Sequence, residues 1–95
     1  MESQQQPPPD VNAILNSAYQ GGPVKMVMDR NGAPLRQMSV QGGMVYSWEQ
    51  DRTMYSQTLP PAQTHCQMDA YVNSQGIVTE MVANGQMAAC TAFLR

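Results

Sequence analysis

The clearest periodic pattern lies near the N-terminus of the chain. Apolar side chains recur there at the spacing of one helical face; they are Val11, Ile14, Leu15, Ala18 and Tyr19. Asp10 precedes this stripe as an N-cap candidate, and Gly21-Gly22-Pro23 follows it with residues that end helices. The pattern predicts a helix of about three turns, in which Ile14 and Leu15 are the most buried residues and the two asparagines face solvent.

The remainder of the chain alternates between apolar and polar residues, which favours strands. We expect strands over residues 24–29, 35–40, 44–50, 65–73 and 77–83. Turn signals separate most of them, at Asn31-Gly32, Gly42-Gly43, Asn73-Ser74-Gln75-Gly76 and Asn84-Gly85. Residues 51–63 are expected to form a long loop, and residues 86–94 a helical turn or a last short strand.

These elements define the expected fold class and domain boundaries. Residues 10–95 suffice for one domain, with an α+β fold in which an N-terminal helix packs on a twisted antiparallel sheet of four to five strands. Residues 1–9 contain three consecutive prolines after three glutamines. They are predicted to be a disordered Pro/Gln-rich linker, the alternative being a ragged terminus with no role.

Composition and charge exclude some function classes. Charged residues make up 13% of the chain, about half the usual share of soluble domains. The five basic residues are scattered and the net charge is −2, which argues against nucleic-acid binding, because that requires clustered cations. No apolar run approaches the roughly 20 residues of a membrane span, and the polar start is unlike a signal peptide. The chain is either a complete cytosolic protein or the mature part of a processed precursor with Met1 added, and we favour the second.

The chain has two cysteines, Cys66 and Cys90. In a small, charge-poor domain this pair predicts one disulfide and an oxidising compartment, the alternative being two buried free thiols. With a two-residue turn at Ser74-Gln75, Cys66 would face Ala83, and a regular third strand would hold Cys90 about 13 Å away. A disulfide needs Cα atoms about 4.4–6.8 Å apart, so we expect the chain to curl back after Ala83.

Candidate catalytic groups do not converge in the sequence. His65 and Cys66 are adjacent on a predicted strand and point to opposite faces, so His65 is badly placed to act as the base for Cys66. One histidine and two cysteines match no zinc spacing, and the glycines match no phosphate-binding motif. We therefore predict no catalytic, metal or cofactor residues, and no enzyme. The nine methionines are spread along the chain and are expected to fill the core, the alternative being a surface that binds soft metals or adaptable partners.

Aromatic residues give the candidate partner-binding site. Tyr46 and Trp48 point to one face of a predicted strand, and Tyr55 lies in the long loop. Aromatic side chains are enriched at interface hot spots, so we expect these three residues to bind a protein partner. The alternative places Trp48 in the core and has the tyrosines cover the edge of the sheet.

Several of these pieces occur together in a known family. A helix ends in Gly21-Gly22-Pro23, and it is followed by Gly43-Met44-Val45-Tyr46-Ser47-Trp48, Cys66, Tyr71-Val72-Asn73-Ser74-Gln75-Gly76-Ile77-Val78, and Gly85 with Cys90. In this the chain resembles small bacterial envelope lipoproteins of the SmpA/OmlA (BamE-like) kind. The resemblance implies an envelope location and a non-enzymatic, protein-binding role. The chain departs from that pattern in having one clear predicted helix instead of two, and no lipidated cysteine.

The expected function is thus a non-enzymatic protein-interaction module of the bacterial cell envelope, periplasmic or outer-membrane-associated. Its expected partner is another envelope protein, and a lipid anchor upstream of this chain would be its only contact with a membrane. The alternative is a secreted or periplasmic inhibitor of a hydrolase, because β-lactamase-inhibitor proteins have a similar helix-on-sheet layout.

Overall fold

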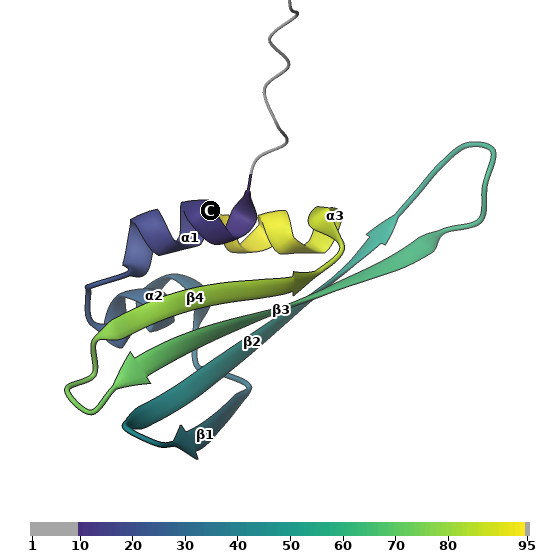
Figure 1. Cartoon of the computed structure of the whole chain (residues 1–95). Helices are drawn as coiled ribbons and strands as arrows, with labels where there is room; N and C mark the ends of the chain where they lie inside the picture. Colours follow the sequence, from purple (N-terminus) through teal and green to yellow (C-terminus); the bar gives the residue numbers. More distant parts are fainter. Residues whose placement is uncertain (1–9, 95) are drawn as a thin grey trace, which may run out of the picture.

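The computed structural model describes residues 10–94, and the predicted linker over residues 1–9 lies outside them. The elements follow in the order α1 (Val11–Tyr19), α2 (Val24–Asn31), β1 (Arg36–Val40), β2 (Gly43–Met54), β3 (Ala62–Asn73), β4 (Val78–Gly85), α3 (Met87–Cys90) and the short 3-10 helix η1 (Thr91–Leu94). The strands form one antiparallel sheet in the order β1-β2-β3-β4 (Figure 1). The predicted α+β class and four-stranded sheet are confirmed, except that two helices precede the first strand where one was expected.

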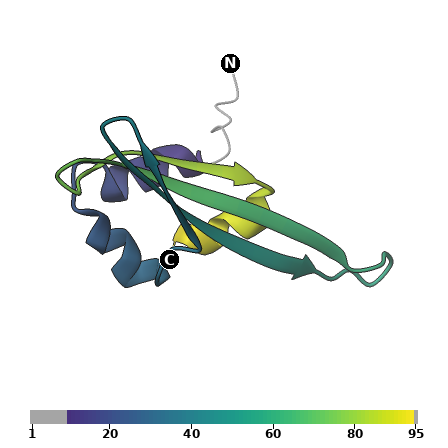
Figure 2. The ribbon, with the colours of Figure 1, turned by 90° about the horizontal axis from the view of Figure 1, so that it is seen from below.

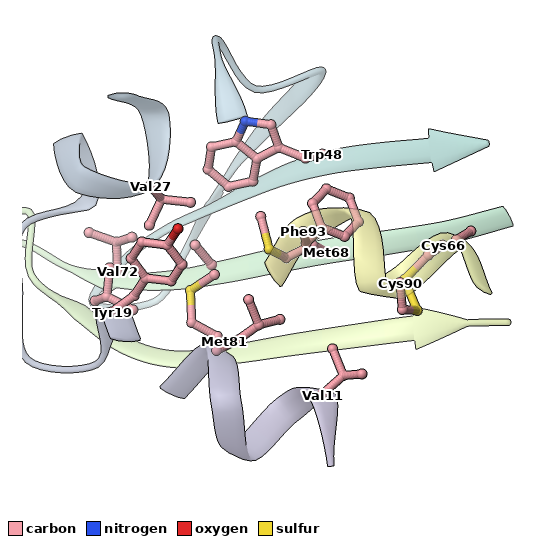
Figure 3. Close-up of a cluster of buried hydrophobic side chains, with 14 residues drawn as sticks. Val11, Tyr19, Val27, Trp48, Cys66, Met68, Val72, Met81, Cys90 and Phe93 are labelled. Carbon is pink, nitrogen blue, oxygen red and sulfur yellow. A yellow bond between two sulfur atoms is a disulfide. The ribbon is translucent and has the colours of Figure 1, made fainter. Parts of the chain in front are cut away.

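The core lies between one face of the sheet and the helices (Figure 3). Trp48, Met68 and Met81 from the strands meet Val27 of α2 and Phe93 of η1 in one cluster, and none of the five exposes more than 4% of its surface. The predicted core-filling role thus holds for Met68 and Met81, which are buried, and for Met28, which packs against the core, whereas four others are exposed: Met26, Met38, Met54 and Met87.

Helix α1 is rotated about its axis relative to the prediction. Its buried residues are Val11, Leu15 and Tyr19, which follow one another at four-residue intervals, whereas Ile14 is 41% exposed. The predicted burial of Leu15 is confirmed and that of Ile14 is wrong. The predicted cap by Asp10 is present, because its carboxylate accepts two backbone amides of the first turn.

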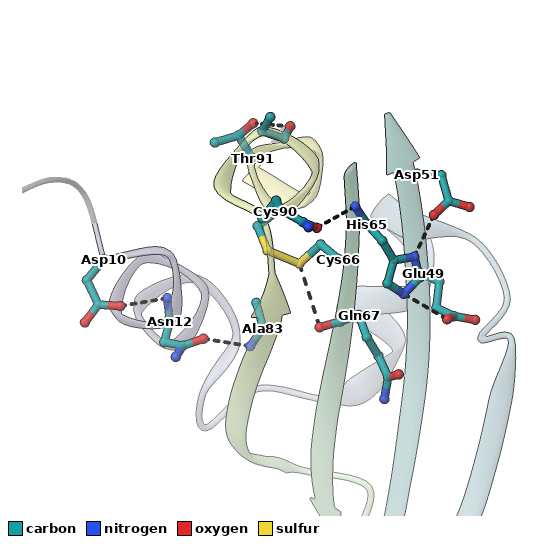
Figure 4. Close-up of a disulfide and its surroundings, with 12 residues drawn as sticks. Asp10, Asn12, Glu49, Asp51, His65, Cys66, Gln67, Ala83, Cys90 and Thr91 are labelled. Atoms are coloured by element: carbon teal, nitrogen blue, oxygen red, sulfur yellow. Dashed lines mark hydrogen bonds and ion pairs between the residues drawn. A yellow bond between two sulfur atoms is a disulfide. The ribbon is translucent and has the colours of Figure 1, made fainter. Parts of the chain in front are cut away.

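The asparagines of α1 hold the outer edge of β4, so their predicted solvent position is wrong as well. The Asn16 side chain accepts from the Met81 amide at 2.8 Å and donates to the Met81 carbonyl at 2.9 Å. Asn12 accepts from the Ala83 amide at 2.7 Å (Figure 4). An edge strand otherwise presents unpaired backbone groups, and these side-chain amides take the place of a neighbouring strand.

The chain just after α1 extends this closure. Gln20 donates its side-chain amide to the Thr79 carbonyl at 2.9 Å. The Gly21 amide donates to the Val78 carbonyl, and the Val78 amide donates to the Gly22 carbonyl, both at 2.8 Å. The outer edge of β4 is therefore occupied along most of its length, and β1 forms the other edge of the sheet.

The predicted strand over residues 24–29 is wrong, because these residues lie in helix α2. A strand would have placed Lys25 and Val27 on the same face. In the helix, Val27 is buried and Met28 packs against the core beside it, while Lys25 stays exposed. Pro23 directly before the helix suits its start, since the first helical turn leaves backbone amides unpaired in any case.

The register between β3 and β4 differs from the prediction by two residues. The turn after Asn73 contains one residue more than predicted, and an irregularity in the strand pairing adds the second shift. Cys66 therefore pairs with Gly85 and not with Ala83. Glycine is required at this position, because a Cβ on Gly85 would lie 2.1 Å from the carbonyl oxygen of His65.

The predicted Cys66–Cys90 disulfide is confirmed. Helix α3 begins two residues after the end of β4 and turns the chain back over the sheet. The two Cα atoms then lie 5.0 Å apart, and both cysteines are buried (Figure 4). Of the two forms expected for the last segment, a helical turn or a strand, the helical one is correct.

We predict that Asn16→Ala lowers the free energy of unfolding by about 1–3 kcal/mol, because it leaves two backbone groups of Met81 without partners. The exposed neighbour Ser17 supplies the control, and Ser17→Ala is expected to change stability by less than about 0.5 kcal/mol. Urea unfolding followed by circular dichroism measures both. Equal stability of the two variants would contradict the role assigned to Asn16.

We also predict that protein folded under oxidising conditions contains no free thiol. Cys66→Ser and Cys90→Ser should lower the melting temperature by similar amounts, since either change removes the same cross-link. For a bridge between residues 24 apart, the chain-entropy model gives a loss of about 3.5 kcal/mol. Intact mass after alkylation, with and without prior reduction, reads the thiols directly, and two alkylated cysteines without reduction would refute the bridge.

Candidate functional site

Strands β2 and β3 continue beyond the core as a two-stranded arm, defined here as residues 52–64. It projects past the helices and the other strands in both views (Figures 1 and 2). The predicted loop over residues 51–63 is therefore wrong in its bounds, since β2 runs to Met54 and β3 begins at Ala62. Strand pairing continues into the arm, where the Thr64 hydroxyl also donates to the Arg52 carbonyl at 2.8 Å.

The tip of the arm presents apolar side chains to solvent. Tyr55 is 80% exposed, Leu59 68% and Met54 41%. Arg52 is the one charged residue of the arm, and Pro60-Pro61 restricts the backbone next to Leu59. An exposed apolar group with few charges around it is characteristic of surfaces that contact other proteins.

The other two candidate partner-binding residues lie elsewhere. Trp48 is buried in the core, which is the alternative that the sequence left open, and its indole N–H donates to the Gly32 carbonyl at 2.9 Å. Tyr46 is half-buried and packs against the same core. The structure does not bring either residue to the arm, and Tyr55 alone of the three is fully accessible to a partner.

A second candidate surface is the sheet face opposite the helices, called here the helix-free face. Side chains from β1, β2 and β3 form one hydrogen-bonded chain across it, called here the polar network and made up of Ser47, Asp69, Gln67, Arg36, Glu49, His65 and Asp51. Its central member is Arg36, whose guanidinium donates to Gln67 at 3.1 Å and to Glu49 at 3.2 Å.

His65 lies between the carboxylates of Asp51 and Glu49 (Figure 4) and directly follows the arm in the sequence. Its Nδ1 lies 2.6 Å from Asp51 and its Nε2 3.1 Å from Glu49. Only the doubly protonated ring can donate to both carboxylates. The pKa of His65 is raised above its ordinary value of 6.5, mainly by the hydrogen bond to Asp51, with partial desolvation opposing and the charges of Asp51 and Glu49 adding to the rise.

The polar network does not bring together a nucleophile and its base. The Ser47 hydroxyl donates to Asp69, and His65 lies four residues from Asp69 along β3, about 13 Å away. Within residues 10–94, no three His, Cys, Asp or Glu side chains are grouped closely enough to hold a metal ion. In that same part of the chain, no helix has the length and apolar character to cross a membrane.

Reasoning from the sequence missed both the polar network and the amide contacts of α1. The network depends on strand register, which pairs Ser47 with Asp69, Glu49 with Gln67 and Asp51 with His65. Its signal in the sequence is a run of polar residues at alternate positions of two strands. The signal for the amide contacts is a second stripe on the helix at four-residue intervals, formed by Asn12, Asn16 and Gln20.

Comparisons of the chain with protein-family models, with curated proteins and with solved structures found no match. The resemblance to lipoproteins of the SmpA/OmlA kind therefore stays a prediction.

We predict that Asp51→Asn lowers the pKa of His65, because it removes the main cause of the raised value. Chemical shifts of the imidazole ring during a pH titration measure this, and Glu80→Gln, which alters a carboxylate outside the polar network, should leave that pKa unchanged. Protonated His65 stabilises the folded state through its two carboxylate partners. This contribution to stability is fully present below about pH 6.5, and it is lost as the pH rises through the raised pKa. The stability deficit of Asp51→Asn should therefore be larger near pH 5 than near pH 9; a deficit that grows with pH would contradict the assignment.

Proposed function

We propose that this chain is a non-enzymatic protein-interaction module of the bacterial cell envelope, and that it binds its partner through the tip of the arm. The observation that carries the proposal is the exposure of Tyr55, Leu59 and Met54 on a segment that projects from the core. Apolar side chains gathered in this way are unfavourable in water and favour burial against another protein.

The structure of the arm makes it suitable for binding. Complete burial of one large apolar side chain stabilises a complex by about 1.5–3 kcal/mol. The paired strands already order much of the backbone near the tip, so less conformational entropy would be lost on association. Tyr55 adds a phenolic hydroxyl that can hydrogen-bond within an otherwise apolar contact.

The envelope location rests on two supports. The Cys66–Cys90 disulfide is compatible with an extracytoplasmic protein, since disulfides persist in oxidising compartments. The resemblance described above suggests the periplasm or the outer membrane, with another envelope protein as the partner. A lipid anchor upstream of this chain would then be its membrane contact.

A second candidate is a secreted or periplasmic inhibitor of a hydrolase. The shape of the arm favours it, because a narrow hairpin with an aromatic residue at its tip can enter an enzyme cleft. The two candidates differ in a direct assay with the bound partner. An inhibitor abolishes the turnover of a hydrolase when added in equal amount, whereas an interaction module leaves enzymatic activity unchanged.

We predict that Tyr55→Ala weakens binding to the partner by more than about 1 kcal/mol, because it removes the most exposed aromatic side chain of the tip. A photoreactive amino acid placed at position 55 identifies the partner in envelope extract, and calorimetry with the purified partner then measures the affinity. The melting temperature of Tyr55→Ala should equal that of the original protein, since Tyr55 is outside the core.

Two comparisons make this test specific. Gln57→Ala changes a polar residue of the same tip and should weaken binding by less than about 0.5 kcal/mol. Leu59→Ala should weaken binding in the same direction as Tyr55→Ala. If both apolar variants bind as well as the original protein, the partner does not use the arm and the proposed binding surface is wrong.

A further inference from the structure

The helix-free face carries a concavity of about 660 Å³ that is separate from the arm. Its apolar wall is one cross-strand row, in which Met38 pairs with Val45 and Val45 with Tyr71. Val45 is buried, whereas Met38 is 62% exposed and Tyr71 38%. Val40 adds a further exposed aliphatic side chain next to them.

Asp69 lines the same concavity with a carboxylate that is held in place. Its Oδ1 accepts the Ser47 hydroxyl at 2.6 Å and the Gln67 side-chain amide at 3.0 Å. Its Oδ2 accepts no hydrogen bond from any described residue. Two donors on one oxygen fix the orientation of the carboxylate, which leaves the other oxygen available to a ligand.

The charge of Asp69 lacks a cationic partner within residues 10–94. Arg36 is the one cation that lines the concavity, but its guanidinium binds Glu49 and Gln67. Glu80, which pairs with Tyr71 across the strands, carries a second carboxylate on this face but does not line the concavity. Asp69 therefore supplies the negative charge that is available beside the apolar wall.

We propose that this concavity binds a lysine side chain of an extended segment of a partner protein. The ammonium group binds Oδ2 of Asp69, and the aliphatic stem packs on Met38, Val45 and Tyr71. Lysine fits better than arginine, because a single point charge matches a single available oxygen, whereas a guanidinium favours two. The tyrosine ring adds attraction for the cation near its face.

A protein segment fits this surface better than a small free amine. A small-molecule site normally covers most of its ligand, whereas this concavity is open along a sheet face. Met38, Val40 and Tyr71 together expose more apolar surface than one alkyl chain would cover. Residues on both sides of the lysine would cover the remainder. The inference does not depend on the proposed role of the arm.

The test uses the whole chain, labelled with ¹⁵N, and the capped peptide Thr-Val-Lys-Val-Thr. We expect the peptide to shift the amide signals of Val45, Ser47, Asp69 and Tyr71. Asp69→Asn keeps an oxygen that accepts from Ser47 and Gln67, and it should lower the affinity for the peptide by about tenfold or more.

Glu80→Gln removes a carboxylate from the same face and serves as the matched control. It should lower the affinity for the peptide by less than about twofold. Met38→Ser changes an exposed residue of the apolar wall and should also lower the affinity for the peptide. This variant supplies the test if Asp69→Asn fails to fold.

Several results would overturn the proposal. Equal binding of a peptide with norleucine in place of lysine would show that no cation is recognised. If hexylammonium binds as tightly as the peptide, the ligand of the concavity is a small amine and not a protein segment. If Asp69→Asn and Glu80→Gln lower the affinity for the peptide equally, the peptide is held only by diffuse attraction between charges. If the peptide does not shift the amide signals of the concavity, it does not bind there. Tyr55→Ala should not affect this titration, so failure here and failure of the arm as a binding surface are distinguishable.

Discussion

The contacts between the side-chain amides of α1 and the outer edge of β4 fix how the helices sit on the sheet. Asn16 satisfies both outward backbone groups of Met81, and Asn12 satisfies the amide of Ala83. Each buried backbone group left unpaired would cost about 1–3 kcal/mol, a large share of the stability of a small domain. These bonds also set the rotation of α1, so that Leu15 points into the core while Ile14 stays exposed.

The disulfide completes the arrangement next to the C-terminal end of β4, where Cys66 pairs with Gly85. It ties α3 to β3, so α3 covers the core beside the start of α1. With the helices held on one face, the opposite face carries the polar network and the concavity, and the strands that run beyond the core form the arm. The two candidate binding surfaces are thus consequences of where the helices and the cross-link are placed.

Part of this structure could be predicted from the sequence. Local patterns of apolar residues predicted the helix at α1 and the strand β3. The disulfide was predicted from the two cysteines in a small, charge-poor domain, and the Cα–Cα distance that a disulfide allows predicted that the chain curls back after β4. The rotation of α1 could not be predicted, because Asn12 and Asn16 are defined by contacts more than 60 residues away. The sequence of α2 does not distinguish a helix from a strand, because short apolar runs fit both periods. The polar network depends on the register between β2 and β3, which the alternation within each strand does not reveal.

Amide hydrogen exchange of Met81 and Ala83 tests the central claim most directly. If Asn16 and Asn12 close the edge of β4, both amides should exchange only through openings close to global unfolding in free energy. Their protection should far exceed that of the β1 amides that point away from β2 at the open edge. Exchange of Met81 and Ala83 as fast as at that open edge would contradict the account, because it would mean that the side-chain amides of α1 do not replace a strand.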